Sequence, residues 1–72
     1  MRGESDVAFV RVDIAKRTQE QKEAIIAGIT DVMVNNGARL ENVQVLLVEH
    51  SPKSWGTHGT TFHKHLNLPD ED

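Results

Sequence analysis

Residues 43–49 read VQVLLVE, and within them four large apolar residues follow one another from Val45 to Val48. A strand that faces water on one side alternates apolar and polar residues. A strand of a parallel sheet is covered on both sides and reads as a continuous apolar run. This segment therefore predicts a strand of a parallel sheet.

A second strand is predicted upstream, at residues 7–14, which read VAFVRVDI. Its residues alternate with period two, as expected for a strand with one core face. The core face would carry Ala8, Val10, Val12 and Ile14, and the opposite face Phe9, Arg11 and Asp13.

A helix is predicted between the two strands. Thr18, followed three positions later by Gln21, fits the capping-box pattern that opens a helix. The helix should end near Asn35–Gly37, because glycine tolerates the left-handed conformation found there. A helix of this length between two strands predicts a right-handed β-α-β crossover with parallel strands. Its core-facing stripe should be Ile25, Ile29, Val32 and Met33, flanked by Ile26, with Lys22, Glu23 and Asp31 left for solvent.

The remaining sequence mixes turn formers with Trp55 and Phe62, which predicts a loop, a short hairpin and a tail. The expected fold class is α+β. It consists of a single β-α-β unit with two parallel strands, one long helix and a short C-terminal hairpin. The expected boundaries are an N-terminal extension at residues 1–7, the β-α-β domain at 8–62 and a polar, acidic tail at 63–72.

Composition indicates that the chain is oligomeric. A chain of 72 residues buries a small share of its surface, and without cysteine it has no disulfides to compensate. Two strands under one helix also leave one face of the sheet bare. Phe9 and whichever of Leu46 and Val48 faces away from the helix should therefore meet a partner subunit.

Charge and hydropathy exclude other partners. A net charge of −3 with an acidic end, Asp70–Asp72, disfavours nucleic-acid binding. No apolar run approaches the ~20 residues of a membrane span, and the amino-terminal residues lack the apolar core of a signal peptide. We expect a cytoplasmic protein with no nucleic-acid and no membrane partner.

Four segments, taken in order, resemble those of the 4-oxalocrotonate tautomerase family. The resemblance covers residues 8 to about 60, and the segments are FVRVDI at 9–14, RTQEQK at 17–22, ENVQV at 41–45 and SWGTHG at 54–59. It implies a tautomerase/MIF-like fold, isomerase activity on small unsaturated keto/enol carboxylic acids without a cofactor, and a hexamer or trimer of dimers. VLLVEH at 45–50 and His58-Gly59 also resemble trans-3-chloroacrylic acid dehalogenase subunits, which form heterohexamers.

The resemblance assigns the catalytic base to a proline that opens the first strand with a free secondary amine. Ala8 occupies that position here, or Val7 if the alignment slips by one residue. Neither nitrogen could serve, because each is a backbone amide. Unless a partner chain supplies the base, the resemblance predicts that the proline function is missing.

Three further positions follow from the resemblance as substrate-binding residues. Arg17, beside Lys16, matches the arginine that grips a substrate carboxylate through its guanidinium fork. Gln44 stands where the family has a second arginine, so one charge is absent. Trp55 takes the place of the pocket aromatic, and it could equally anchor the loop to a neighbouring subunit.

The histidines are the remaining candidates. His58 is a weak catalytic candidate, because Thr57 replaces the glutamate that would activate water in dehalogenase-like chains. His50 and Asp13 are alternative bases. His63 and His65 would share a face of an extended strand, but two ligands are too few for zinc, so no metal site is expected.

Three functional hypotheses remain open. The chain could be a tautomerase-family subunit that meets its proline on another chain. It could be a catalytically inactive tautomerase-fold binding or structural module, or an enzyme that uses another base on the same scaffold.

Overall fold

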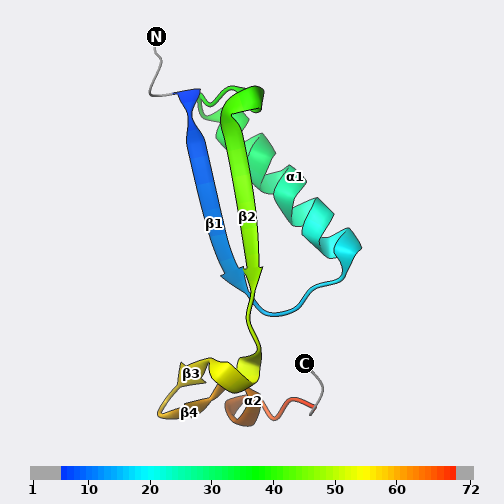
Figure 1. Ribbon diagram of the computed structural model, residues 1–72, viewed down its shortest axis with the longest axis vertical. Helices are drawn as coiled ribbons and strands as arrows, with labels where there is room; N and C mark the ends of the chain where they lie inside the picture. Colours follow the sequence, from blue (N-terminus) through cyan, green and yellow to red (C-terminus); the bar gives the residue numbers. More distant parts are fainter. Residues whose placement is uncertain (1–5, 70–72) are drawn as a thin grey trace.

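A computed structural model describes residues 6–69 of the chain. Residues 1–5 of the expected extension and residues 70–72 of the expected tail lie outside this range. The predicted α+β fold, a β-α-β unit followed by a short hairpin, is confirmed (Figure 1). The elements are β1 (Ala8–Ile14), α1 (Gln19–Asn35), η2 (Leu40–Asn42), β2 (Val43–Glu49), η3 (Pro52–Ser54), β3 (Gly56–Thr57), β4 (Thr60–Thr61) and α2 (Phe62–His65).

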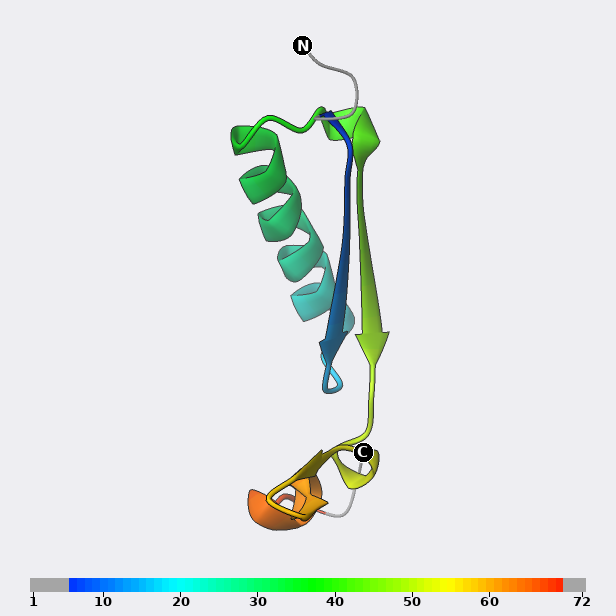
Figure 2. The ribbon, with the colours of Figure 1, turned by 90° about the vertical axis from the view of Figure 1, so that its left-hand side faces the viewer.

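Strands β1 and β2 pair in parallel, from Ala8 opposite Val43 to Ile14 opposite Glu49. The predicted alternation holds along β1, where the exposed residues are Phe9, Arg11 and Asp13. Helix α1 covers one face of the two strands, and the other face is open (Figure 2).

Helix α1 begins as the sequence predicts. The Thr18 Oγ1 accepts a hydrogen bond from the Gln21 N–H at 3.1 Å, and the Thr18 N–H donates to Gln21 Oε1 at 3.0 Å. These two bonds satisfy donors that the first helical turn leaves without intrahelical partners. The helix ends at Asn35, and Gly37 follows with a φ of 110°.

Two positions on α1 differ from the prediction. Val32, expected on the core-facing stripe, is 58% exposed. A sheet of two strands covers only a narrow stripe of the helix, and Val32 lies outside that stripe. Lys22, expected in solvent, is partly covered, and its Nζ lies 3.6 Å from Glu49 Oε1. The attraction of that carboxylate holds the side chain against the sheet end.

The C-terminal unit follows β2 and includes η3, the β3–β4 hairpin and α2. The rings of Trp55 and Phe62 meet edge to face, with centroids 5.7 Å apart. Helix α2 spans Phe62–His65. Leu66 and Leu68, which follow it, help line an apolar depression of 170 Å³ beside Trp55. From His50 to Pro69 the sequence has no carboxylate side chain and contains all four histidines.

The single chain has almost no interior. Among the described residues only Ala38 is buried. The radius of gyration is 16.0 Å, whereas a compact domain of this length measures about 11 Å. Phe9 is 62% exposed and Leu46 is 47% exposed on the open sheet face. An apolar face of this kind marks a protein contact surface.

None of the helices within residues 6–69 has the length and apolar character that a membrane crossing requires.

We therefore expect the purified chain to be oligomeric at micromolar concentration. Sedimentation equilibrium should give a multiple of the single-chain mass of 8.1 kDa. Phe9→Lys should weaken the association, because it places a charge on the apolar face that a partner would cover. Asn35→Lys introduces the same charge at the exposed end of α1 and should leave the association less affected. A wild-type chain that sediments only as a monomer would contradict the prediction.

Candidate functional site

The carboxyl ends of β1 and β2 lie side by side and bring two titratable residues together. The His50 N–H donates to the Ile14 carbonyl at 2.8 Å, which extends the parallel ladder by one bond. Asp13 and His50 then meet, with 2.7 Å between Asp13 Oδ1 and His50 Nε2. Asp13 and His50, the alternative bases named from the sequence, form a hydrogen-bonded pair.

Arg11 is a second partner of Asp13 on the open sheet face. Its NH2 group donates to Asp13 Oδ1 at 3.1 Å, and its Nε donates to Oδ2 at 3.3 Å. The hydrogen bond from His50 and then that from Arg11 lower the pKa of the Asp13 carboxyl below its ordinary value. Asp13 is therefore ionised at neutral pH.

Trp55 forms the wall of the pocket that contains this pair. The depression has a volume of 280 Å³ and is lined by Asp13, His50, Ser54 and Trp55. The rings of His50 and Trp55 are 5.7 Å apart and inclined by 59°. Phe62 also packs on Trp55, so the indole contacts both the His50 ring and the Phe62 ring.

Arg17 lies at the same edge of the sheet but outside this pocket. Its backbone N–H donates to Glu49 Oε2 at 2.9 Å, and its NH1 group donates to the carbonyls of Ala15 and Lys16 at 3.0 and 3.1 Å. The bond from the Arg17 backbone, followed by the charge of Lys22, lowers the pKa of Glu49. Glu49 thus fixes the loop that carries Arg17 to the end of β2.

Lys16, expected beside Arg17 as part of an anion site, lies at a neighbouring depression of 160 Å³. Glu49 and His50 line the same depression. His50 is therefore the residue that this depression shares with the pocket of Asp13 and Trp55.

Ala8 and Gln44 lie at the opposite end of the sheet from Arg17. Ala8 pairs with Val43 where β1 begins, and Gln44 pairs with Phe9. A strand rises about 3.3 Å per residue, so Ala8 and Ile14 are roughly 20 Å apart. Within one chain the structure does not bring Ala8 and Gln44 together with Arg17, because β1 and β2 begin at one end of the sheet and the loop that follows β1 lies at the other (Figure 1).

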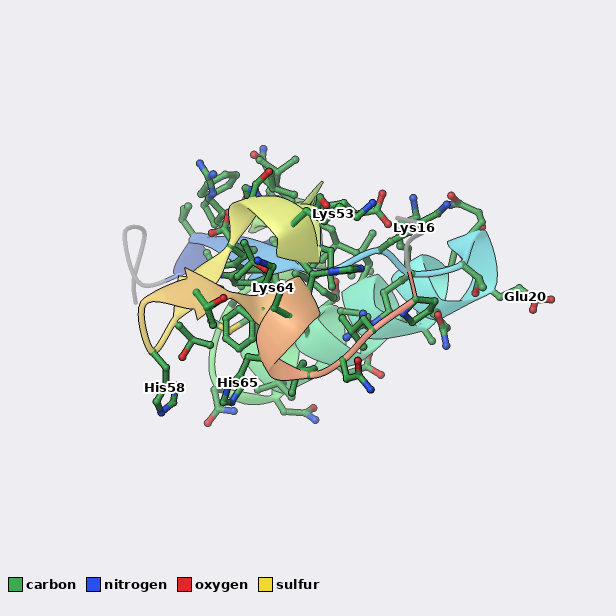
Figure 3. The ribbon with its side chains drawn as sticks, turned by 90° about the horizontal axis from the view of Figure 1, so that it is seen from below. Lys16, Glu20, Lys53, His58, Lys64 and His65 are labelled. Atoms are coloured by element: carbon green, nitrogen blue, oxygen red, sulfur yellow. The ribbon has the colours of Figure 1, made fainter. Side chains whose placement is uncertain are left out.

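His58 lies at the turn of the β3–β4 hairpin, away from the Asp13–His50 pair. It has a φ of 53°, and its Nδ1 is 3.0 Å from Thr57 Oγ1. Its ring stacks on that of His65, with centroids 4.7 Å apart and planes 8° apart (Figure 3). His63 and His65 lie in a helical turn, so they do not share a face as they would in an extended strand. Within residues 6–69 no three metal-ligating side chains are grouped.

Sequence reasoning did not single out Arg11, and it named Asp13 and His50 without a geometry. The signal that could have found the pair is the parallel register. Because the carboxyl ends of parallel strands meet at one edge, a polar residue near the end of one strand lies beside the residue that follows the other.

Comparison with known proteins identifies the family. The sequence profile described as "Tautomerase enzyme" matches residues 9–71. The chain belongs to the tautomerase family. No curated protein matches the sequence of this chain.

Solved structures support the same conclusion. The chain is 36% identical to a 4-oxalocrotonate tautomerase isozyme of Methylibium petroleiphilum, with a TM-score of 0.70 over 75% of this chain and 90% of the other. It is 33% identical to a chain from a study of trans-3-chloroacrylic acid dehalogenase activity, with a TM-score of 0.65 over 74% and 95%. DmpI of Helicobacter pylori shares the fold at 24% identity, with a TM-score of 0.71 over 78% and 97%.

The paired carboxylate of Asp13 gives a direct test of the site geometry. Asp13 should titrate below the ordinary value of about 3.9, as measured by ¹³C NMR of its carboxyl carbon. His50→Ala should raise the pKa of Asp13, because it removes a hydrogen bond to the ionised form.

Glu49 is the internal control. Its pKa is lowered chiefly by the Arg17 backbone, so it should not respond to His50→Ala. Because the folded-state pKa of Asp13 is lowered, its interactions stabilise the fold above about pH 4. This contribution is lost as the pH falls through the folded-state pKa. An Asp13 pKa unchanged by His50→Ala would contradict the hydrogen bond.

Proposed function

We propose that the chain is a tautomerase-family subunit that handles small unsaturated keto/enol carboxylic acids. Arg17 binds the substrate carboxylate, and a partner chain supplies the amine base that Ala8 does not provide. Membership of the family supports the general chemistry. The similarity to chains studied as 4-oxalocrotonate tautomerase and for dehalogenase activity supports the class of small carboxylate substrates.

The observation that carries the proposal is the separation of Ala8 and Arg17 at opposite ends of the sheet. A substrate held by Arg17 cannot reach the amino end of β1 in the same chain across roughly 20 Å. A site that needs both positions must be built where the amino end of one chain meets the carboxyl end of another. This chain would then contribute the arginine and its partner the base.

The geometry around Arg17 fits carboxylate binding. NH1 is engaged by the carbonyls of Ala15 and Lys16, which holds the guanidinium plane against its own loop. Its Nε and NH2 groups have no partner among the described residues. These two N–H groups form a fork that matches the two oxygens of a carboxylate. Lys16 adds positive charge beside it.

The base must come from elsewhere because the nitrogen of Ala8 is a peptide amide, joined to Val7. An amide nitrogen has no basic lone pair, since resonance delocalises it into the carbonyl. A terminal secondary amine keeps its lone pair and can carry a proton between two substrate atoms. In the assembly we propose, a hexamer or trimer of dimers, the chain and a proline-bearing partner alternate as a hetero-oligomer.

The alternative is a catalytically inactive tautomerase-fold binding or structural module, assembled as a homo-oligomer. Gln44 supports it, because a neutral amide replaces an arginine in the family pattern. The exposed Phe9 and Leu46 are compatible with both functions, since a surface of this kind serves a structural assembly as well as a catalytic one.

Activity of the chain mixed with a proline-bearing tautomerase chain distinguishes a catalytic subunit from an inactive binding module. The chain alone should convert 2-hydroxymuconate far more slowly than a mixture refolded with a tautomerase chain that begins with proline after methionine removal. Since general acid–base catalysis contributes about 10²- to 10⁴-fold, the mixture should exceed the chain alone by about that factor. A mixture without activity above the proline-bearing chain would favour the binding module.

Arg17→Ala should lower kcat/KM of the mixture by about 10- to 100-fold, the cost of a charge-assisted pair of hydrogen bonds. Arg39→Ala is the matched control. Arg39 is also exposed, but it pairs with Asp6 and Glu41 at the opposite end of the sheet. Equal losses in the two variants would contradict the role of Arg17.

Recovery of activity in a single chain is a separate prediction. Removing residues 1–7 and replacing Ala8 by a terminal proline should create measurable tautomerase activity, because it restores a basic amine at the amino end of β1. Adding Gln44→Arg should raise kcat/KM further, since a charged donor binds more strongly than a neutral one. A folded, assembled Ala8→Pro variant that is inactive with and without Gln44→Arg would contradict a tautomerase pocket.

A further inference from the structure

The pocket at the carboxyl end of the sheet contains a carboxylate–imidazole pair that the proposed function does not use. Asp13 Oδ1 and His50 Nε2 are 2.7 Å apart, and both residues line the depression with Ser54 and Trp55. From this geometry we infer a second proton-transfer site that needs no proline. In it, His50 removes a proton from the carbon next to the carbonyl group of a small, planar, neutral carbonyl compound.

The charge of Asp13 determines which nitrogen of His50 carries a proton. Arg11 holds the carboxylate through two hydrogen bonds, and the pKa of Asp13 is lowered, so the group is ionised at neutral pH. An ionised carboxylate only accepts hydrogen bonds. His50 Nε2 must therefore donate, and the lone pair of the neutral ring is on Nδ1. Nδ1 has no partner among residues 6–69.

The walls of the pocket indicate the class of substrate. A volume of 280 Å³ is slightly below the range of about 300–1,000 Å³ for small-molecule sites, so the ligand must be small. The indole of Trp55 offers a surface against which a flat conjugated molecule can pack. The lining holds no lysine or arginine, and it includes the anionic Asp13. A neutral substrate fits this lining better than a carboxylate.

The step we propose balances without a further reagent. His50 Nδ1 takes the proton from the carbon, and the electron pair of the broken C–H bond forms a carbon–carbon double bond. The electrons of the carbonyl double bond move to its oxygen, which gives an enolate. Asp13 stabilises the imidazolium that forms. Returning the proton to the oxygen gives the enol, and returning it to the carbon regenerates the ketone.

The charged groups around His50 come from both sides of the sheet end. Asp13, with Arg11 behind it, lies in the pocket, and Lys16 and Glu49 line the neighbouring depression that His50 shares. Only the neutral imidazole can act as a base.

The test uses the full chain alone and ethyl benzoylacetate, a neutral 1,3-dicarbonyl compound with a flat aryl ketone. Exchange of its central CH₂ protons in D₂O is followed by ¹H NMR. The chain should accelerate the exchange above the buffer rate. In His50→Gln the exchange catalysed by the chain should be slower by at least about 100-fold, the low end of the range for a general base. His65→Gln, which removes a histidine outside the pocket, should retain it.

Asp13 acts as a positioning residue, and its effect is measured as the tautomer that His50 adopts. ¹⁵N NMR of the wild-type chain should show the proton of neutral His50 on Nε2. In Asp13→Asn the amide can also donate, so the tautomers should mix and the exchange should slow by about tenfold or more. Circular dichroism and sedimentation establish that each variant keeps the wild-type fold and assembly.

Exchange no faster than buffer, equal exchange by wild type and His50→Gln, or a wild-type proton on Nδ1 would each overturn the proposal. The last measurement needs no substitution. The probe carries no carboxylate and the assay contains no partner chain, so the outcome is independent of the Arg17 experiment.

Discussion

The parallel register between β1 and β2 is the constraint on which both proposed sites depend. Ile14 lies opposite Glu49, so Asp13, His50 and the loop of Arg17 reach the same edge of the sheet. A slip of one residue would turn every side chain of a strand to the other face. Asp13 would then leave the open face, and Glu49 could no longer hold the loop from the end of β2.

Local sequence patterns predict most of the fold, because they act over a few residues. The alternation in β1, the apolar run of β2 and the Thr18–Gln21 capping box each specify one element, and each is found in the structure. The errors concern longer-range effects. Val32 is exposed because the sheet is only two strands wide, and Lys22 is partly covered because Glu49 attracts it from a distant part of the chain.

The candidate site was less predictable for the same reason. Arg11 and Asp13 are near neighbours on one strand, but their relation to His50 exists only once the strands are paired. Conversely, the resemblance groups Ala8, Gln44 and Arg17 as one site, whereas Arg17 lies at the opposite end of the sheet from the other two. A sequence motif lists residues that act together, but it does not state on how many chains they lie.

The C-terminal unit has a consequence for the order of folding. Trp55 packs on Phe62, and the β3–β4 hairpin joins residues that are close in sequence, so this unit closes only short loops. Pairing β1 with β2 must instead close the long segment 15–42, which costs more chain entropy and slows folding. The capping box favours formation of α1 within that segment, and a formed helix leaves fewer flexible residues between the two strands. We therefore expect helix and hairpin to form early, with the sheet and its paired Asp13 and His50 completed last.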